Sequence, residues 1–310
     1  MKRLLPERIN QKGQALLIVL LTMAVILTVV LSVISRSVTD ISVTTLDEEA
    51  LRAFSAAEAG VERALIVGSD VSETVGAEGS SFTATISGIA QGSTSFAYPT
   101  EIFSGESVYI WFVSHSATGS LTCGGQPCFT GSTGKICWGT VGTDPNSSGA
   151  PAVEISAFYD PALTGVSAGN YSSVRVGRAT FDPNAGRRAS NNFSAASGAC
   201  SAGGEDFAFS GGIAFGTDAN PSTVDLSIPC VGSAGCLLTL RIRTLYNDSL
   251  THPIGIDVNP ATLPAQGRRI DSTGTSASGA SIRKIEAYRT FGGPPPIFDG
   301  SVFSEQSVIK

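Results

Sequence analysis

One uninterrupted apolar run near the start of the chain constrains the fold more than any other feature. No charged residue occurs from Gly13 to Ser35, and the run from Ala15 to Leu31 is almost wholly apolar. Because an α-helix rises ~1.5 Å per residue, about 20 such residues cross a bilayer. The sequence therefore predicts a membrane-spanning helix. Its expected membrane and stem-packing residues are Leu16, Leu17, Leu20, Leu21, Ile26, Leu27 and Leu31.

The helical pattern continues beyond the length that a membrane requires. No proline and a single glycine, Gly60, interrupt residues 14–66. Apolar residues recur after Arg36 at steps of three or four, which is the spacing of one helix face. We therefore expect a single helix over 14–66. The residues expected to pack it against the head are Leu46, Phe54, Val61 and Leu65.

Residues 1–13 form a short basic leader in front of this helix. Four lysines and arginines against Glu7 give the leader a charge of +3. By the positive-inside rule, the N-terminus stays cytoplasmic and everything after the span is exported. A cleavable secretory signal usually has a shorter apolar region, of ~7–15 residues, and a small-residue cleavage site. The longer run and the lack of a good Ala-x-Ala site disfavour that class, whereas a plain signal anchor stays open.

Two segments resemble parts of type IV pilins and pseudopilins. The basic leader with Lys12-Gly13, followed by Gln14-Ala15-Leu16-Leu17-Ile18-Val19-Leu20-Leu21, resembles their class III signal. Residues 48–65 contain Ala53-Phe54-Ser55-Ala56-Ala57-Glu58-Ala59, which resembles the A-F-x-A-A-E-A segment of PilX-type minor pilins. The resemblance covers about residues 8–66.

The resemblance implies processing and assembly. In that family a prepilin peptidase cuts after the glycine, here Gly13, and N-methylates the new first residue, here Gln14. That first residue is usually Phe or Met. Most major pilins carry Glu at the fifth mature position, where this chain has Ile18, as in PilX-type and tip-located pseudopilins. The implied protein is a non-enzymatic minor subunit with other pilin-like subunits as partners. It would be a single-pass bacterial cell-membrane protein with its head at the cell surface.

The rest of the chain predicts a β-rich head over 82–310, as one domain or two subdomains, after a linker over 67–81. Short apolar or alternating runs are separated by Gly-, Pro- and Asn-rich turn clusters, so the expected fold is α+β. Residues 107–114 are apolar on both faces and predict a central strand, whereas 238–243 alternate and predict a half-buried one. The other expected strands are 82–86, 152–159, 173–178, 254–258 and 297–303, and residues 282–291 fit either a strand or a short helix.

All six cysteines follow the membrane span, where an even number indicates disulfides. Six cysteines allow 15 pairings. Cys230 and Cys236 flank a small flexible loop and are the favoured pair. Cys123 could close similarly on Cys128, which would leave Cys137 with Cys200. A zinc site is the alternative, but the spacings do not match closely paired ligands, and no metal or cofactor is expected.

Two short motifs raise the question of chemistry in the head. Gly165-Val166-Ser167-Ala168-Gly169 matches the G-x-S-x-G of serine hydrolases, and His252 follows it in the chain order of that triad. No oxyanion-hole motif accompanies it, so a glycine-rich turn is expected and an exported hydrolase stays a remote alternative. Residues 182–186 have a D-x-N-x-G pattern but lack the remaining ligands of a calcium loop, so a proline-initiated turn is expected there.

Charge gives no general support for nucleic-acid binding. The net charge is −6, and it becomes −9 without the leader. Basic pairs at 187–188, 268–269 and 283–284 are expected to be solvated, and His115 is expected to be hydrogen-bonded locally at a strand edge. The sequence therefore favours a filament subunit that assembles through its N-terminal helix. The alternative is a membrane-anchored surface binding or adhesion module that enters no filament.

Overall fold

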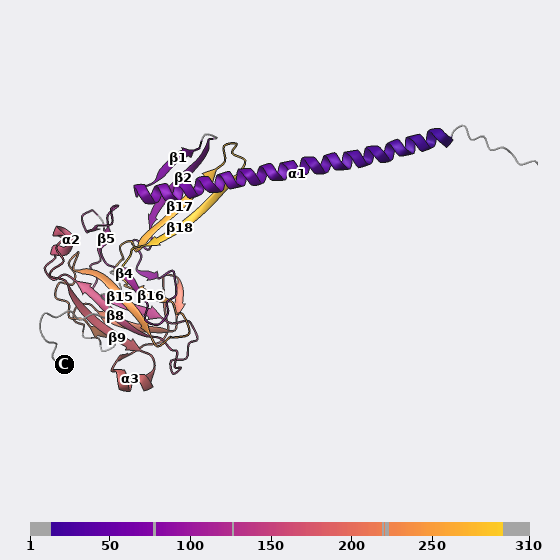
Figure 1. The fold of residues 1–310 in the computed structure, drawn as a ribbon. Coiled ribbons are helices and arrows are strands. Elements are labelled where there is room, and N and C mark those ends of the chain that lie inside the picture. Colours follow the sequence, from indigo (N-terminus) through magenta and orange to yellow (C-terminus); the bar gives the residue numbers. More distant parts are fainter. Residues whose placement is uncertain (1–13, 77–78, 126, 219, 221–222, 294–310) are drawn as a thin grey trace, which may run out of the picture. The chain divides into compact units, whose positions relative to one another are not determined.

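The protein combines one long N-terminal helix with a β-rich body that contains three disulfides (Figure 1). This architecture is that of a computed structural model, which describes residues 14–76, 79–125, 127–218, 220 and 223–293. The chain divides into two compact units. The first contains residues up to Ala84 together with Asp271–Ile285, and the second contains Thr85–Ile270 and the residues from Glu286 onward. The boundaries between the units fall inside strands β2, β17 and β18.

Helix α1 runs without interruption over Gln14–Val67, a length of 54 residues. Its threonines satisfy their own hydroxyls: Thr22 and Thr28 donate to carbonyls three residues back, and Thr39 donates four residues back. Such back-bonding keeps polar groups satisfied on an otherwise apolar helix. The helix ends where Gly68 adopts a positive φ of 76° and its N–H donates to the carbonyl of Ala64. Glycine allows this left-handed end at no steric cost.

A four-stranded sheet has the order β1-β2-β17-β18. Its strands are β1 (Val71–Val75), β2 (Ser80–Gly88), β17 (Gly267–Thr275) and β18 (Ile282–Thr290). Strands β1 and β2 form an antiparallel hairpin in which Val71 pairs with Ala84 and Val75 with Ser80. The sequence predicts a linker over 67–81, but Val71–Val75 and the residues from Ser80 onward form the two strands of this hairpin. Three polar, exposed residues stand between the two valines of β1, so the strand has no strong alternation of apolar and polar residues.

Within the first unit, the C-terminal part of α1 packs on the sheet through its smallest residues. Ala53, Ala57 and Ala64 are completely buried. A Cβ atom added to Gly274 in β17 would lie only 2.1 Å from the carbonyl oxygen of Ala53 and 2.4 Å from the amide nitrogen of Ala57. A Cβ added to Gly60 would lie 2.2 Å from Oγ of Ser272. Helix and strand therefore approach backbone to backbone, which only glycine and alanine permit.

The second unit is built from two five-stranded sheets. The first has the order β10-β9-β8-β15-β4, with β4 at Ser107–Trp111, β8 at Ala152–Tyr159, β9 at Arg175–Asp182, β10 at Ser194–Ala195 and β15 at Leu237–Leu245. The second has the order β14-β13-β7-β16-β3, with β3 at Ser95–Ala97, β7 at Thr133–Trp138, β13 at Phe209–Ala214, β14 at Thr223–Asp225 and β16 at Ile254–Asp257.

Short elements complete the second unit. Two hairpins pair β5 (Ser114–His115) with β6 (Leu121–Thr122) and β11 (Cys200–Ala202) with β12 (Glu205–Phe207). The short helices are α2 (Thr164–Ala168) and α3 (Ala185–Asn191). One buried apolar cluster takes side chains from both large sheets, including Ile155 and Leu240 from the first and Ile136 and Ile254 from the second. The two sheets therefore share a core, as alternating inward-facing strands require.

Two strand predictions are wrong in their placement. Strand β4 is predicted to be central, but it forms an edge of its sheet. Both of its faces are apolar because they pack in different clusters: Ile110 lies in the main core, and Trp111 lies in a smaller one. The amide of Gln266 covers that edge, since it accepts from the N–H of Trp111 and donates to its carbonyl at 2.8 Å each. Strand β15 is central and buried on both faces, with Arg241 only 2% exposed.

Other strand predictions agree with the structure or lie outside it. The strand predicted over 152–159 is β8, and 282–290 form the strand β18 in place of a helix. The strand predicted over 297–303 lies outside the described residues.

A buried carboxylate organises the segment around α3. Asp182 is fully buried and accepts from Nε and Nη2 of Arg187 at 3.0 and 2.8 Å, and from the side chain of Asn191 at 2.8 Å. The same guanidinium donates to the carbonyls of Ser148 and Ala150. Burial raises the pKa of Asp182, but the hydrogen bonds and the charge of Arg187 outweigh burial and lower the pKa below its ordinary value.

We expect Gly274→Val to separate α1 from the sheet of the first unit, because the added carbon atoms would overlap the backbone of Ala53 and Ala57. Overpacking of this kind costs roughly 1–3 kcal/mol. Trypsin cleavage after Arg52 and Arg63, both on the packed part of α1, should become faster. Gly149→Val is the matched control, because a Cβ at Gly149 meets nothing within 4 Å. Equal cleavage rates in the two variants would contradict the backbone-to-backbone contact.

Asp182→Asn should destabilise the second unit at neutral pH by about 3 kcal/mol, because it leaves Arg187 without its charge partner. Since the folded-state pKa of Asp182 is lowered, its stabilisation is complete above the ordinary carboxyl pKa and is lost as pH falls through the folded-state value. The variant should therefore lose less stability on acidification than the parent. Fluorescence of Trp111 and Trp138, the only tryptophans and both in this unit, measures unfolding. Asp206→Asn is the control, because Asp206 is exposed and asparagine can still accept the hydrogen bond from Ser201, and it should leave the stability at neutral pH almost unchanged.

Candidate functional site

The first two-thirds of α1 has no packed neighbour among the residues that the structure describes. Every residue from Ala15 to Glu48 is exposed. The predicted membrane and stem residues Leu16, Leu17, Leu20, Leu21, Ile26, Leu27 and Leu31 are 57% to 66% exposed. Among the described residues, α1 is the one helix long and apolar enough to cross a membrane. An apolar surface of this extent needs lipid or other apolar helices around it.

The exposed part of α1 extends past the length of a membrane span. Residues 36–48 add about 20 Å of helix at ~1.5 Å per residue. This segment, which we call the free stem, also carries the apolar side chains of Val38, Ile41 and Leu46, which are 62%, 64% and 55% exposed. Its charged residues are Arg36, Asp40, Asp47 and Glu48. It is rich in β-branched residues, whose helix propensity is low. The free stem therefore has both an apolar surface and a weak intrinsic preference for its conformation.

Of the four residues predicted to pack α1 against the head, two are exposed and two are half-buried. Leu46 and Phe54 are 55% and 44% exposed, so this prediction is wrong for both, and Val61 and Leu65 are half-buried. The contact instead uses Ala53, Ala56, Ala57, Gly60 and Ala64. Large side chains are displaced from the contact because Gly274 and Ser272 of β17 approach the helix too closely to admit them. The small residues recur at steps of three and four, and that spacing is the sequence signal for this face.

A polar contact at the N-terminal end of this packed face joins the helix to the β17–β18 turn. The hydroxyl of Ser278 donates to Oε2 of Glu49 at 2.7 Å. Hydrogen bonds from Ser276 and Ser278 lower the pKa of Glu49, so its carboxylate stays ionised at neutral pH. Of the predicted processing residues, Gln14 is the first residue of α1, and Gly13 lies outside the described residues.

Ser167 and His252 do not form a nucleophile–base pair. Gly165–Gly169 does not form a simple turn: Thr164–Ala168 is the short helix α2, and the hydroxyl of Ser167 donates to the carbonyl of Leu163 at 2.8 Å. His252 is buried, and its Nδ1 accepts from the N–H of Thr140 at 3.2 Å. Burial lowers the pKa of His252, which favours a neutral ring. The Ser167 hydroxyl and Nδ1 of His252 are therefore each engaged in a structural hydrogen bond.

The calcium-like motif is an arginine-binding turn. Both carboxylate oxygens of Asp182 are engaged by Arg187, and the side chain of Asn184 accepts from the N–H of Arg187 to cap α3. In the part of the chain that the structure describes, no group of three or more His, Cys, Asp or Glu side chains could hold a metal ion.

The prediction of solvated basic pairs is confirmed for Arg283 and Lys284, which are exposed, and is wrong for Arg187, which is half-buried in an ion pair. Arg187 is bound by Asp182, and Arg269 lies 3.1 Å from Glu286. In the other unit, Lys284 lies 3.4 Å from Asp271.

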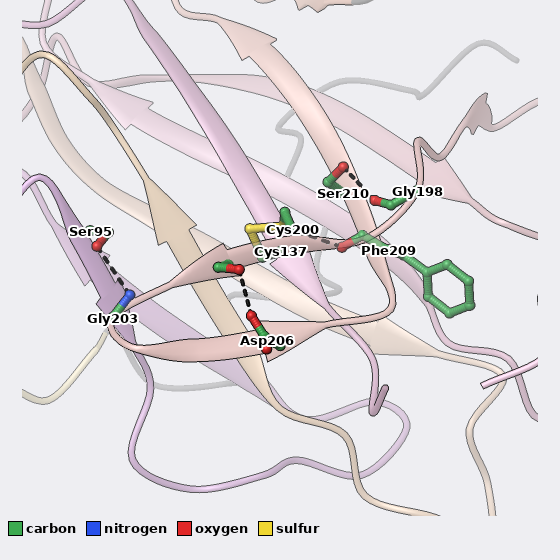
Figure 2. The surroundings of a disulfide bond; sticks show 9 residues. Ser95, Cys137, Gly198, Cys200, Gly203, Asp206, Phe209 and Ser210 are labelled. Carbon is green, nitrogen blue, oxygen red and sulfur yellow. Dashed lines mark hydrogen bonds between the residues drawn. A yellow bond between two sulfur atoms is a disulfide. The ribbon is translucent and has the colours of Figure 1, made fainter. Parts of the chain in front are cut away.

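The cysteines form the favoured set of three disulfides. Cys230–Cys236 and Cys123–Cys128 close small loops, and Cys137–Cys200 joins β7 to the β11–β12 hairpin. Figure 2 shows this last bond beside a second link of the hairpin, in which the N–H of Gly203 donates to Oγ of Ser95 at 3.0 Å. Within the hairpin, the hydroxyl of Ser201 donates to Asp206. No cysteine is free, so none is available as a zinc ligand.

His115 differs from the prediction of a locally hydrogen-bonded residue. Its ring stacks on Phe291 at a centroid distance of 3.9 Å and meets the edge of Trp111 at 4.5 Å. Its Nδ1 is buried and has no hydrogen-bond partner among the described residues. Burial, followed by the nearby charge of Arg268, lowers the pKa of His115 to about 4. The aromatic neighbours could not be recognised from the sequence, because Phe291 is 176 positions away along the chain.

The candidate site with the greatest exposed apolar extent is therefore the surface of α1, and the second unit contributes a disulfide-linked β body. Comparison with known proteins adds no relative: no protein-family model, curated protein or solved structure matches this chain.

Proposed function

We propose that this protein is a membrane-inserted, non-enzymatic subunit of a type IV pilus or a related filament, in the manner of a PilX-type minor pilin. The observation that carries the proposal is the free stem: α1 continues for residues 36–48 beyond the uncharged span with Val38, Ile41 and Leu46 exposed. The described residues of the chain supply no cover for these side chains. Other helices of the same kind would cover them, as they would cover the membrane-spanning part once it leaves the bilayer.

The way α1 is held within the first unit supports this proposal. Packing through Ala53, Ala57 and Gly60 uses a narrow strip of the last turns only. The outer side of the same turns stays open, with Leu51 68% and Ile66 78% exposed. A helix attached along one narrow strip can present most of its circumference to neighbours. In contrast, a signal anchor needs only the span of about 20 residues and gains nothing from an apolar free stem.

We expect the mature protein to begin at N-methylated Gln14. Intact mass and N-terminal peptide mapping of the protein from its native membrane measure this directly. The expected change is the loss of residues 1–13 and the addition of one methyl group. A chain that still begins at Met1, in cells where other prepilins are cut, would reject the filament proposal. It would favour the second candidate, a membrane-anchored surface binding module.

Asparagine substitutions on the free stem should reduce assembly without unfolding the head. Val38→Asn with Ile41→Asn removes two exposed apolar side chains, each worth roughly 1.5–3 kcal/mol when buried by a neighbour. The fraction of protein recovered in sheared, sedimented surface filaments should fall at least tenfold, while tryptophan unfolding stays unchanged. Thr45→Asn is the control, because asparagine and threonine have similar helix propensity. If the double variant assembles as well as the control, the free stem is not an assembly surface.

A photo-crosslinker placed at Ile41 should capture other helix-bearing subunits. Val141, in a loop of the second unit, has the same exposed fraction of 64% and provides the matched position for non-specific capture. Mass spectrometry should identify peptides from the N-terminal helix of a neighbour in the Ile41 product. Capture of lipid alone at position 41, or equal products at both positions, would count against assembly through this surface.

A further inference from the structure

A small hollow in the second unit lies beside the stacked ring of His115. It has a volume of about 210 Å³, and its lining includes Ser87, Gly88, Gln91, His115, Arg268 and Phe291. At ~30 Å³ per water molecule in the liquid, this volume equals about seven waters. No acidic side chain contributes to the lining. The hollow therefore has room for a small ligand or for one end of a larger one.

Arg268 brings a fixed positive charge to this hollow. Its Nη2 donates to the carbonyl oxygens of Ser116 and Ala117 at 3.0 and 3.2 Å, which holds the guanidinium in place. In the described part of the chain, no carboxylate forms an ion pair with Arg268. Arg187 and Arg269 differ, since each lies within ion-pair distance of a carboxylate. A half-buried guanidinium held only by neutral oxygens keeps its charge available for an anion.

The neighbouring groups suit the rest of such a ligand. His115 is uncharged at neutral pH, so it adds no second cation, and its ring forms an aromatic wall together with Phe291. Gln91 is exposed. The side-chain amide of Gln91 lies directly beside Gly88, because a Cβ atom added to Gly88 would be only 2.5 Å from Oε1 of Gln91. Ser87 and Gln91 can donate and accept hydrogen bonds. The hollow therefore offers the guanidinium of Arg268 to a carboxylate, and the hydroxyl of Ser87 and the amide of Gln91 to hydroxyl groups of the same ligand.

We propose that this hollow binds the carboxylate of a small hydroxylated acid, such as a sugar acid, with Arg268 as the anion-binding residue. The guanidinium presents its remaining N–H groups to the carboxylate, and Gln91 and Ser87 bond the adjacent hydroxyls. The body of the ligand extends from the hollow into solvent. This binding site is separate from assembly through α1, so its failure would leave the proposed function standing.

The test uses the full chain in nanodiscs and two matched probes, glucuronate and glucose, which differ by a carboxylate. His115 and His252 are the only histidines in the chain, so histidine-selective NMR labelling gives one reporter beside the hollow and one internal control. A bound carboxylate favours the charged imidazolium, so glucuronate should raise the pKa of His115 from about 4. Glucose should leave the pKa of His115 unchanged, and neither probe should affect His252.

Arg268→Gln should weaken glucuronate binding at least tenfold, because a charge-assisted pair is lost. It should also raise the pKa of His115 without ligand, since the neighbouring positive charge is removed. Arg243→Gln is the control, at another half-buried arginine that donates to a carbonyl, and should bind glucuronate as the parent does. Arg268→Lys keeps the positive charge but loses the planar guanidinium that can form two parallel hydrogen bonds with a carboxylate. This variant should bind glucuronate with intermediate affinity.

Three results would overturn the proposal. The first is that glucuronate produces no shift at His115. The second is that glucose shifts His115 as strongly as glucuronate, which would make the hollow a neutral sugar site. The third is equal weakening by Arg268→Gln and Arg243→Gln, which would indicate a general effect of net charge.

Discussion

The close approach of α1 to β17 decides which residues of the helix are buried in the first unit and which stay exposed. Gly274, Ala53 and Ala57 bring two backbones together with almost no side-chain volume between them. Such a contact holds the helix by dispersion over a narrow strip and by the Glu49–Ser278 hydrogen bond. It does not require the large apolar residues of α1. Those residues are therefore left for lipid in the membrane and, in the proposed filament, for neighbouring helices.

The loops of the second unit are held in a different way, by buried charged side chains that each have polar partners. Asp182 accepts from Arg187 and Asn191, and Asp160 is likewise fully buried and accepts from backbone N–H groups near α2. The fully buried Arg241 lies 3.7 Å from Glu154. Buried polar groups are costly unless paired, so each of these bonds fixes one segment of loop-rich chain in one position. Loops that would otherwise be loosely held are anchored on the sheets by these groups and by the three disulfides.

Local patterns account for what could be predicted from the sequence. An uncharged apolar run predicts α1, and short turn-bounded runs predict a β-rich body with disulfides, because these features follow from spacing and composition alone. The packed face of α1 could not be read from apolar periodicity. Leu46 and Phe54 have the right spacing, but the contact is set by Gly274, more than 200 positions away. The buried state of Arg241, the edge position of β4 and the stacking of Phe291 on His115 also depend on distant partners.

The chain passes from the first unit to the second and back through two strands of one sheet, and this connection affects how freely the segment between them can vary in length. Residues 85–270 leave from β2 and return to β17, and these two strands are neighbours in one sheet. Residues 85–270, the larger part of the second unit, are therefore inserted between two adjacent strands, and a third crossing inside β18 adds the residues from Glu286 onward. A connection between adjacent strands can be a short turn or a complete domain without altering the strands themselves. The length of the inserted segment is therefore not restricted by α1 or by its small-residue contact with Gly274, which both lie in the first unit.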